Sequence, residues 1–354
     1  MTRRRIATVL VALVGLIGPG SWALAQELPA TVVQSGEPTD TIKKYVEGCL
    51  ADMAGPDAAK IRQGRDRMLA PLKNPAVSVK FRQEASRAAE RDLRRLADSQ
   101  VELVSINALR VAGELATLDT GTLVADKLKD SRRSVRLFSA AAIGRIFMAV
   151  DQSSPAIGKD DVLVLVERLG EAAKSDPEAP VVHTAIQSLL IGAGVQRAGF
   201  EAVRPRSITV LSAQVGARAR GLKGDDIKPA LLGPMLEAQA AARDALTVNN
   251  PKLELSPDAV KAALELNGHM LAAVVRLRKE FAADPEMKDL AEQIIRVAET
   301  AAAVGAPKMG GQYTPTQMEA DFKAGKDREF FQKALDMFRT LESGPLNLGP
   351  FFKP

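Results

Sequence analysis

The sequence predicts an all-α protein. From Thr39 onward, apolar residues recur every three or four positions, which places them on one face of a helix. The clearest stripe consists of Val101, Val104, Ala108, Val111, Leu115 and Leu118. Helix-start signals also recur, since Ser256-Pro257-Asp258 combines an N-cap, a first-turn proline and an acid near the positive end of the helix dipole. The one strand-like run, Ile208 to Leu211, is interpreted as part of a helix.

Residues 1–25 have the pattern of a secretory signal peptide. Arg3 to Arg5 form a cationic start, Ile6 to Ile17 is apolar, and Ala23-Leu24-Ala25 supplies small residues for cleavage. The apolar run is too short for a membrane-spanning helix, which needs about 20 residues. We therefore expect an exported protein, periplasmic or extracellular, with no membrane span after cleavage.

The charge balance argues against a nucleic-acid binder. The chain of 354 residues has 48 Lys and Arg against 43 Asp and Glu. Three arginines and no acid lie in residues 1–25, so 45 basic and 43 acidic residues remain after cleavage, a net charge of +2. Cys49 is the single cysteine, which excludes an intrachain disulfide and indicates a small buried hydrophobe.

Two segments align as internal repeats, residues 72–80 and residues 128–136. Each places a polar residue, Asn74 or Asp130, five positions before a valine that is followed by a cation. A third copy begins at Asp176 without the cation. A helix pair of about 30 residues cannot bury its apolar stripe alone, so repeats of this length predict stacked helix pairs. The alternative is an irregular helical bundle with an accidental echo.

The repeats resemble HEAT repeats, most closely the short variety of phycobilisome-lyase-like proteins. The resemblance is carried by Ala108–Leu115, Leu123–Asp130, Val135-Arg136 and Ala140–Ile146, and residues 104–113 align with residues 135–144 at an offset of 31. It is good over residues 100–150 and weaker over residues 70–195. It implies an α-solenoid, and helix-pair solenoids act mostly as protein-binding scaffolds.

The resemblance also implies a ladder between an Asp in each turn and an Arg that opens the second helix. Asp130 and Arg136 match these positions, and Asp176 matches the Asp of the next unit. Asn74 and Lys80 are approximate matches. The departures from the pattern are Ser99, Ser105 and Val182.

These observations predict five segments. They are a signal peptide over residues 1–25, a flexible leader over 26–38, HEAT-like repeats over 39–204, a further helical region over 205–342 and an apolar tail over 343–354. Whether the helices after residue 205 continue the stack or close a separate cleft is left open. The tail either packs back onto the last helix or extends to a partner.

No motif in the chain indicates catalysis, a cofactor or a metal. His183 and His269 are the two histidines, which excludes a histidine-rich metal site, and no paired cysteines or GxSxG sequence occur. His183 is interpreted as a partly buried packing residue, and His269 as a partner for Glu265 one turn earlier. The sequence therefore assigns no catalytic, cofactor-binding or metal-binding residue.

One stretch concentrates positive charge. Residues 60–95 hold eleven basic and four acidic side chains, and Arg87, Arg91, Arg94 and Arg95 fall near one helix face. One interpretation is a solvated face with local ion pairs to Glu84 and Glu90. The other is a patch for an anionic partner, either an acidic protein or an anionic envelope polymer.

The leading functional hypothesis is a non-enzymatic, exported scaffold that binds a protein partner. The alternative is an envelope polysaccharide or peptide hydrolase or lyase that uses an Asp/Glu pair on a helical scaffold. A third hypothesis is a structural subunit that forms homo-oligomers through its solenoid ends or through residues 330–352.

Overall fold

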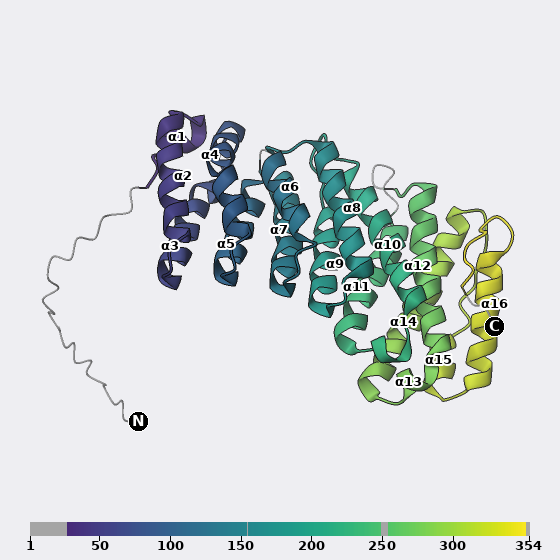
Figure 1. The fold of residues 1–354 in the computed structure, drawn as a ribbon. Coiled ribbons are helices and arrows are strands. Elements are labelled where there is room, and N and C mark those ends of the chain that lie inside the picture. Colours follow the sequence, from purple (N-terminus) through teal and green to yellow (C-terminus); the bar gives the residue numbers. More distant parts are fainter. Residues whose placement is uncertain (1–26, 154, 249–253, 352–354) are drawn as a thin grey trace, which may run out of the picture.

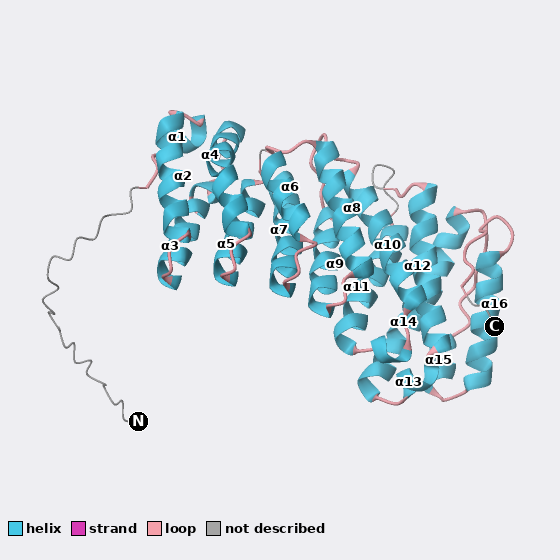
Figure 2. Cartoon of the chain, in the orientation of Figure 1, coloured by secondary structure: helices cyan, strands magenta, loops and turns pink. Residues whose placement is uncertain are grey.

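The protein is an elongated stack of antiparallel helices, as Figures 1 and 2 show. The computed structural model describes residues 27–153, 155–248 and 254–351. The described part contains α-helices, two short 3-10 helices and one isolated bridge between Thr117 and Ala156, and no strand. The predicted all-α solenoid is confirmed. The predicted signal peptide, residues 1–25, lies outside the described residues.

The helices of the first half are α1 (Ala30–Ser35), α2 (Thr39–Met53), α3 (Ala58–Leu69), α4 (Val79–Ala97), α5 (Glu102–Leu115), α6 (Leu118–Lys127), α7 (Arg133–Gln152), α8 (Lys159–Ser175) and α9 (Ala179–Ala193). Those of the second half are α10 (Val203–Gly221), α11 (Pro229–Leu246), α12 (Pro257–Arg276), α13 (Arg278–Ala282), α14 (Pro285–Lys308), α15 (Met318–Lys323) and α16 (Asp327–Glu342).

The helices form two layers. The first layer runs through α2, α4, α6, α8, α10 and α12, and each of these helices packs against the next. The second layer runs in the same way through α3, α5, α7, α9, α11 and α14. Each helix also packs against its partner in the other layer, so the apolar side chains form a core that extends along the whole stack.

The predicted stripe over residues 101–118 belongs to two helices. Val104, Ala108, Val111 and Leu115 are buried on α5, whereas Val101 and Leu118 are 56% and 51% exposed. The chain turns at Ala116, whose φ is 50°, and Thr117 then caps α6 with its side chain. The apolar spacing alone predicts one helix through Leu118, but the turn at Ala116 ends α5 at Leu115.

The stack has no break at residues 204/205. α10 packs against α8 before it and α12 after it, and α11 packs against both α9 and α14. The predicted HEAT-like and C-terminal regions are therefore one continuous arrangement. The stack ends at α15 and α16, which pack against α14 and α12.

The segment expected as a flexible leader contains a helix. Within residues 26–38, α1 buries Val32 and Val33, and the backbone carbonyl of Val33 accepts a hydrogen bond from the Ser78 amide. Pro29, Gly36 and Pro38 predict an irregular segment, but the burial of the two valines packs α1 against α4.

The apolar tail packs back onto the protein. Leu346, Leu348 and Phe351 are buried, and the ring of Phe351 lies 5.0 Å from that of His269 on α12. The Phe351 amide donates to a carboxylate oxygen of Glu342 at 2.7 Å. The tail therefore covers the last helices, as the first of the two sequence interpretations expected.

Residues 72–80 and residues 128–136, aligned above as copies of one repeat, are not structurally equivalent. Val135 lies in the first turn of α7 in the second layer, whereas Val79 is the first residue of α4 in the first layer. Helices in the two layers run in opposite directions, so residues 72–80 lie at the other edge of the stack from residues 128–136. The true equivalent of α7 is α5, which the 31-residue offset had also indicated.

The close approach of α5 and α7 depends on Gly113. A Cβ atom at this position would lie 2.8 Å from the carbonyl oxygen of Ala142 and 3.0 Å from its Cα atom. We expect Gly113→Ala to lower the free energy of unfolding by about 1–3 kcal/mol because the two backbones must separate. Chemical denaturation measures the change.

Gly233→Ala is the matched control, because Gly233 lies within α11 and a Cβ atom there meets nothing within 4 Å. This control is expected to raise the free energy of unfolding by about 0.5–1 kcal/mol. Equal effects of the two substitutions would contradict the packing described for α5 and α7.

Candidate functional site

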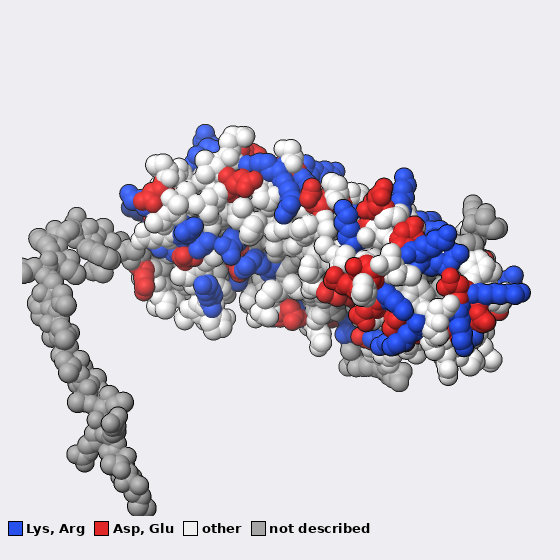
Figure 3. Space-filling model, turned by 90° about the horizontal axis from the view of Figure 1, so that it is seen from below, with Lys and Arg blue, Asp and Glu red and all other residues white. Residues whose placement is uncertain are grey.

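The turns that lead from the first layer to the second share one edge of the stack, which is the lower edge in Figure 1. We call this edge the lower rim. It contains the turns at residues 98–101, 128–132, 176–178 and 222–228. Viewed from below (Figure 3), acidic and basic side chains are interspersed along it, with acidic side chains gathered near α9 and α11.

Arg132 connects the first two of these turns. Its guanidinium pairs with both carboxylate oxygens of Asp130, at 2.9 and 3.0 Å. It also donates to the carbonyl oxygen of Ser99 and, at 3.2 Å, to the hydroxyl of Ser105. Ser99 and Ser105, the two serines that depart from the family pattern, are therefore hydrogen-bond partners of Arg132, an arginine outside the predicted ladder.

Arg136 connects the second turn to the third. It donates to both carboxylate oxygens of Asp176, at 2.7 and 3.2 Å, and to the carbonyl oxygen of Asp130 at 3.0 Å. The Asp176 side chain is 5% exposed and also accepts from the Glu178 amide at 2.9 Å. The structure thus brings together Asp130, Arg136 and Asp176 across two units.

Two further arginines extend this series of contacts. Arg218 on α10 donates to the carbonyl oxygens of Lys174 and Asp176, both at 2.9 Å, at the end of α8. Arg276 on α12 donates to the carbonyl oxygens of Ala219 and Arg220 at the end of α10. Both arginines lie in the last turn of a helix, where a cation commonly complements the dipole, so the sequence alone did not mark them.

Asn74 and Lys80 do not join the ladder. Asn74 accepts a hydrogen bond from the Ala76 amide at 2.9 Å, and Lys80 forms an ion pair with Glu37. Both residues lie at the opposite edge of the stack, because α4 belongs to the first layer and runs in the opposite direction to α7. Their assignment as ladder residues is corrected by these contacts.

The arginine patch on α4 is largely offset by acids of the same helix. Arg87 pairs with Glu84 at 2.7 Å, Arg94 with Glu90 at 3.6 Å, and Arg95 with Asp92 at 2.9 Å. Arg91 is exposed and has no carboxylate within 4 Å in the described part of the chain. These contacts agree with the solvated-face interpretation.

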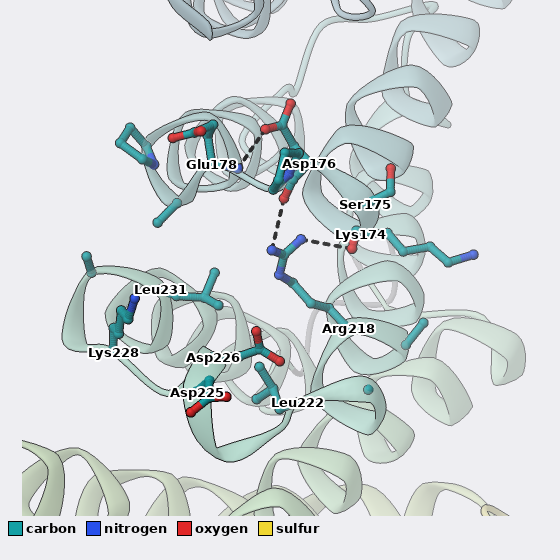
Figure 4. Close-up of a pocket in the computed structure, with 16 residues that line it drawn as sticks. Lys174, Ser175, Asp176, Glu178, Arg218, Leu222, Asp225, Asp226, Lys228 and Leu231 are labelled. Atoms are coloured by element: carbon teal, nitrogen blue, oxygen red, sulfur yellow. Dashed lines mark hydrogen bonds between the residues drawn. The ribbon is translucent and has the colours of Figure 1, made fainter.

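A cleft of about 620 Å³ opens on the lower rim between the third and fourth turns. We call it the rim cleft. Figure 4 shows Arg218 pointing between Glu178 on one side and Asp225 and Asp226 on the other, with Leu231 across from it. Its lining residues are Lys174, Ser175, Asp176, Pro177, Glu178, Ala179, Pro180, Ala217, Arg218, Gly221, Leu222, Asp225, Asp226, Lys228, Ala230 and Leu231.

Two carboxylates of the rim cleft accept hydrogen bonds from other groups of this chain. Both oxygens of Asp176 accept hydrogen bonds from Arg136, and an oxygen of Asp226 accepts from the Lys223 amide at 3.0 Å. Asp225 and Asp226 are neighbours on one short turn. The described residues contain no group of three or more His, Cys, Asp or Glu side chains that could hold a metal ion.

Neither histidine lines the rim cleft. His183 is exposed, in contrast to the expected partial burial, and lies 4.0 Å from Glu237. His269 is buried and hydrogen-bonds Arg220 at 3.0 Å instead of the expected Glu265. Burial, with Arg220 and Arg276 nearby, lowers the pKa of His269 to about 4, so the imidazole is neutral at pH 7.

Cys49 is a core residue. Its side chain is fully buried between the first helices, and burial raises the pKa of its thiol to about 11. A thiol with this pKa stays protonated at neutral pH and is unreactive.

Comparison with known proteins identifies no family. No protein-family model matches the sequence, and no curated protein matches it. Among solved structures, a designed armadillo repeat protein in complex with the peptide (KR)4 is 13% identical and has a TM-score of 0.38, covering 71% of this chain and 98% of its own. Human deoxyhypusine hydroxylase in complex with glycerol is 15% identical with a TM-score of 0.19, covering 76% and 98%. Likenesses this distant establish no function, and the solenoid class rests on the helix packing described above.

The Asp130–Arg132 pair predicts a pH-dependent loss of stability. Arg132 holds the pKa of Asp130 at about 2, below its ordinary value of 3.8, so the folded protein binds this proton less readily than the unfolded chain. The contribution, about 1 kcal/mol, is therefore present above pH 4 and disappears as the pH falls toward 2.

We expect Asp130→Asn to remove this contribution at neutral pH and to flatten the decline in unfolding free energy between pH 4 and 2. Denaturation of both proteins across this range is the measurement. Parallel curves for wild type and variant would show that the pair does not stabilise the fold.

Breaking the Arg136–Asp176 pair is expected to be costly, because one buried charge would lose its partner. Arg136→Gln should lower the free energy of unfolding by about 2–4 kcal/mol, as measured by chemical denaturation. Adding Asp176→Asn should recover part of the loss. Arg94→Gln, which breaks an exposed pair, should change stability by less than about 0.5 kcal/mol. Strictly additive losses in the double variant would contradict the coupling.

Proposed function

We propose that this protein is an exported, non-enzymatic scaffold that binds a protein partner in the rim cleft. The continuous two-layer stack supports this proposal because repeated helix pairs create long surfaces suited to extended partners. We also propose that the units around residues 100–150 are HEAT-type repeats, supported by Asp130 in the turn and Arg136 near the start of the second helix.

The composition and support of the rim cleft carry the proposal. Apolar Pro177, Leu222 and Leu231 lie among charged side chains of both signs, a mixture that occurs in protein interfaces. Arg218 ties the wall formed by α10 to the end of α8 through its hydrogen bonds to backbone carbonyls. A cleft whose walls are joined in this way loses little conformational entropy when a partner binds.

Export is supported by the signal-peptide pattern of residues 1–25. Within the described residues, no helix combines the length and apolar character that a membrane span requires. We expect mass spectrometry of the protein from fractionated cells to show a chain that begins at Gln26 in the extracytoplasmic fraction. A protein that retains residues 1–25 in the cytoplasmic fraction would contradict export.

Five large apolar side chains of residues 330–352, which the hypothesis of oligomerisation would place at a contact between copies, lie inside the chain. Phe330, Phe338, Leu341, Leu346 and Phe351 are buried within the protein. These side chains close the end of the stack, so the apolar character of this segment is explained by intrachain packing.

The test of the rim cleft is a substitution that fills it. Ala230 is exposed in the first turn of α11 and lines the cleft, so Ala230→Trp should block entry without disturbing the core. A protein cross-linked to wild type in extracytoplasmic extract should be reduced at least about tenfold with this variant.

Ala58→Trp is the matched control, because Ala58 is exposed in the first turn of α3 and lies outside the cleft. It should retain the partner. Undiminished cross-linking of the same partner to Ala230→Trp would place the binding surface elsewhere, and recovery of no specific protein with wild type would overturn the scaffold proposal.

A further inference from the structure

A second pocket lies at the edge opposite the lower rim, and we call it the upper-rim pocket. It encloses about 290 Å³ between the α3–α4 turn, the end of α5 and the end of α7. α7 has 20 residues whereas its equivalent α5 has 14, so the last part of α7 extends beyond α5 and forms one wall. The pocket therefore arises from the unequal length of two neighbouring helices.

Positive charge predominates in this pocket. Its lining includes Lys73, Arg82 and Arg145 against a single acid, Glu114, a net charge of +2. Glu114 is already paired with Arg145. Lys73 is exposed, and the Arg145 side chain is 39% exposed at the mouth.

Arg82 is the buried cation of the pocket, with 3% of its surface exposed. Its hydrogen bonds go to the carbonyl oxygens of Glu114 and Leu115 and, at 3.2 Å, to the hydroxyl of Ser153, and its Nε atom has no partner. None of these acceptors is a carboxylate. The Glu114 carboxylate is the one in the pocket lining that acts on Arg82, and it does so without a hydrogen bond to it. A buried guanidinium whose hydrogen bonds all go to neutral groups favours a further anion nearby.

Part of the excess positive charge of residues 60–95 lies in the upper-rim pocket. In the described part of the chain, six of the eleven basic side chains lie within 4 Å of a carboxylate: Arg65, Arg67, Lys80, Arg87, Arg94 and Arg95. The other five are Lys60, Arg62, Lys73, Arg82 and Arg91. Two of these five, Lys73 and Arg82, line the upper-rim pocket.

We propose that the upper-rim pocket binds a carboxylate group of an extended peptide, with Lys73 and Arg145 at its mouth and Arg82 beneath them. The planar fork of an arginine matches a carboxylate, and Arg145 already holds one in Glu114. Met148, 42% exposed, provides an apolar contact beside the cations. The pocket is separate from the rim cleft, so this inference stands or falls independently of the proposed function.

The experiment compares two fluorescein-labelled hexapeptides in low salt by fluorescence anisotropy. One ends in Asp with a free carboxylate, and the other ends in Asn with an amide. Wild-type protein should bind the acidic peptide at least about tenfold more tightly than the neutral one. Lys73→Gln and Arg145→Gln should each weaken the acidic peptide about tenfold, whereas Arg91→Gln, an exposed cation outside the pocket, should leave its binding unchanged.

Glu114→Gln gives the sharpest test, because it removes the acid that competes for Arg145. This variant should bind the acidic peptide about three- to tenfold more tightly than wild type, a gain that a purely structural role for these residues would not produce. The substitutions are placed at the mouth because Arg82 also holds the end of α5. Circular dichroism confirms that each variant is folded.

Three results would overturn the proposal. The first is equal affinity for the acidic and neutral peptides, and the second is weaker or unchanged binding in Glu114→Gln. The third is displacement of the acidic peptide by inorganic phosphate at the concentration of the peptide itself, which would show a general anion site. If phosphate weakens binding of the acidic peptide only at the millimolar concentrations at which any salt screens charge, the result supports the carboxylate assignment.

Discussion

Each helix pair of this protein completes the burial of its apolar residues against the neighbouring pairs. α10 shows the constraint, because Val203, Leu211 and Val215 are buried while the helix lies between α8 and α12. The contact with α8 is so close that a Cβ atom at Gly170 would lie 2.3 Å from Val210. Stability in such a stack is a sum over pairs and their interfaces, so the first and last pairs need covers, which α1 and the apolar tail provide.

Stacking also brings the ends of successive helices together, where backbone carbonyls need hydrogen-bond donors. Arginines supply these donors along the lower rim. Arg132, Arg218 and Arg276 donate to carbonyl oxygens of the preceding unit. Arg136 donates to a carbonyl oxygen of its own turn. Asp176 and Arg218 also line the rim cleft. The contacts that stabilise the stack therefore also shape the surface that we propose binds a partner.

The helical class, the solenoid and the central ladder residues were predictable because they depend on local periodicity and on a turn motif. The register of the first repeat was not, since residues 72–80 and 128–136 share a polar residue, a valine and a cation but begin helices in opposite layers. α1 was missed because two valines in a proline-rich segment give no periodicity. The two pockets were missed because their residues come from turns and helix ends far apart in sequence, and the upper-rim pocket depends on the extra length of α7.

Native-state hydrogen exchange tests the continuity of the stack most directly. Leu211→Asp places a charge in the buried face of α10, the helix that packs against both α8 and α12. If stability passes from neighbour to neighbour, amide protection should fall most in α8, α9, α11 and α12 and remain near wild type in α2 to α5. Unchanged protection throughout α8 and α9, with collective opening of α10 to α16, would instead show two independent domains that meet near residue 204.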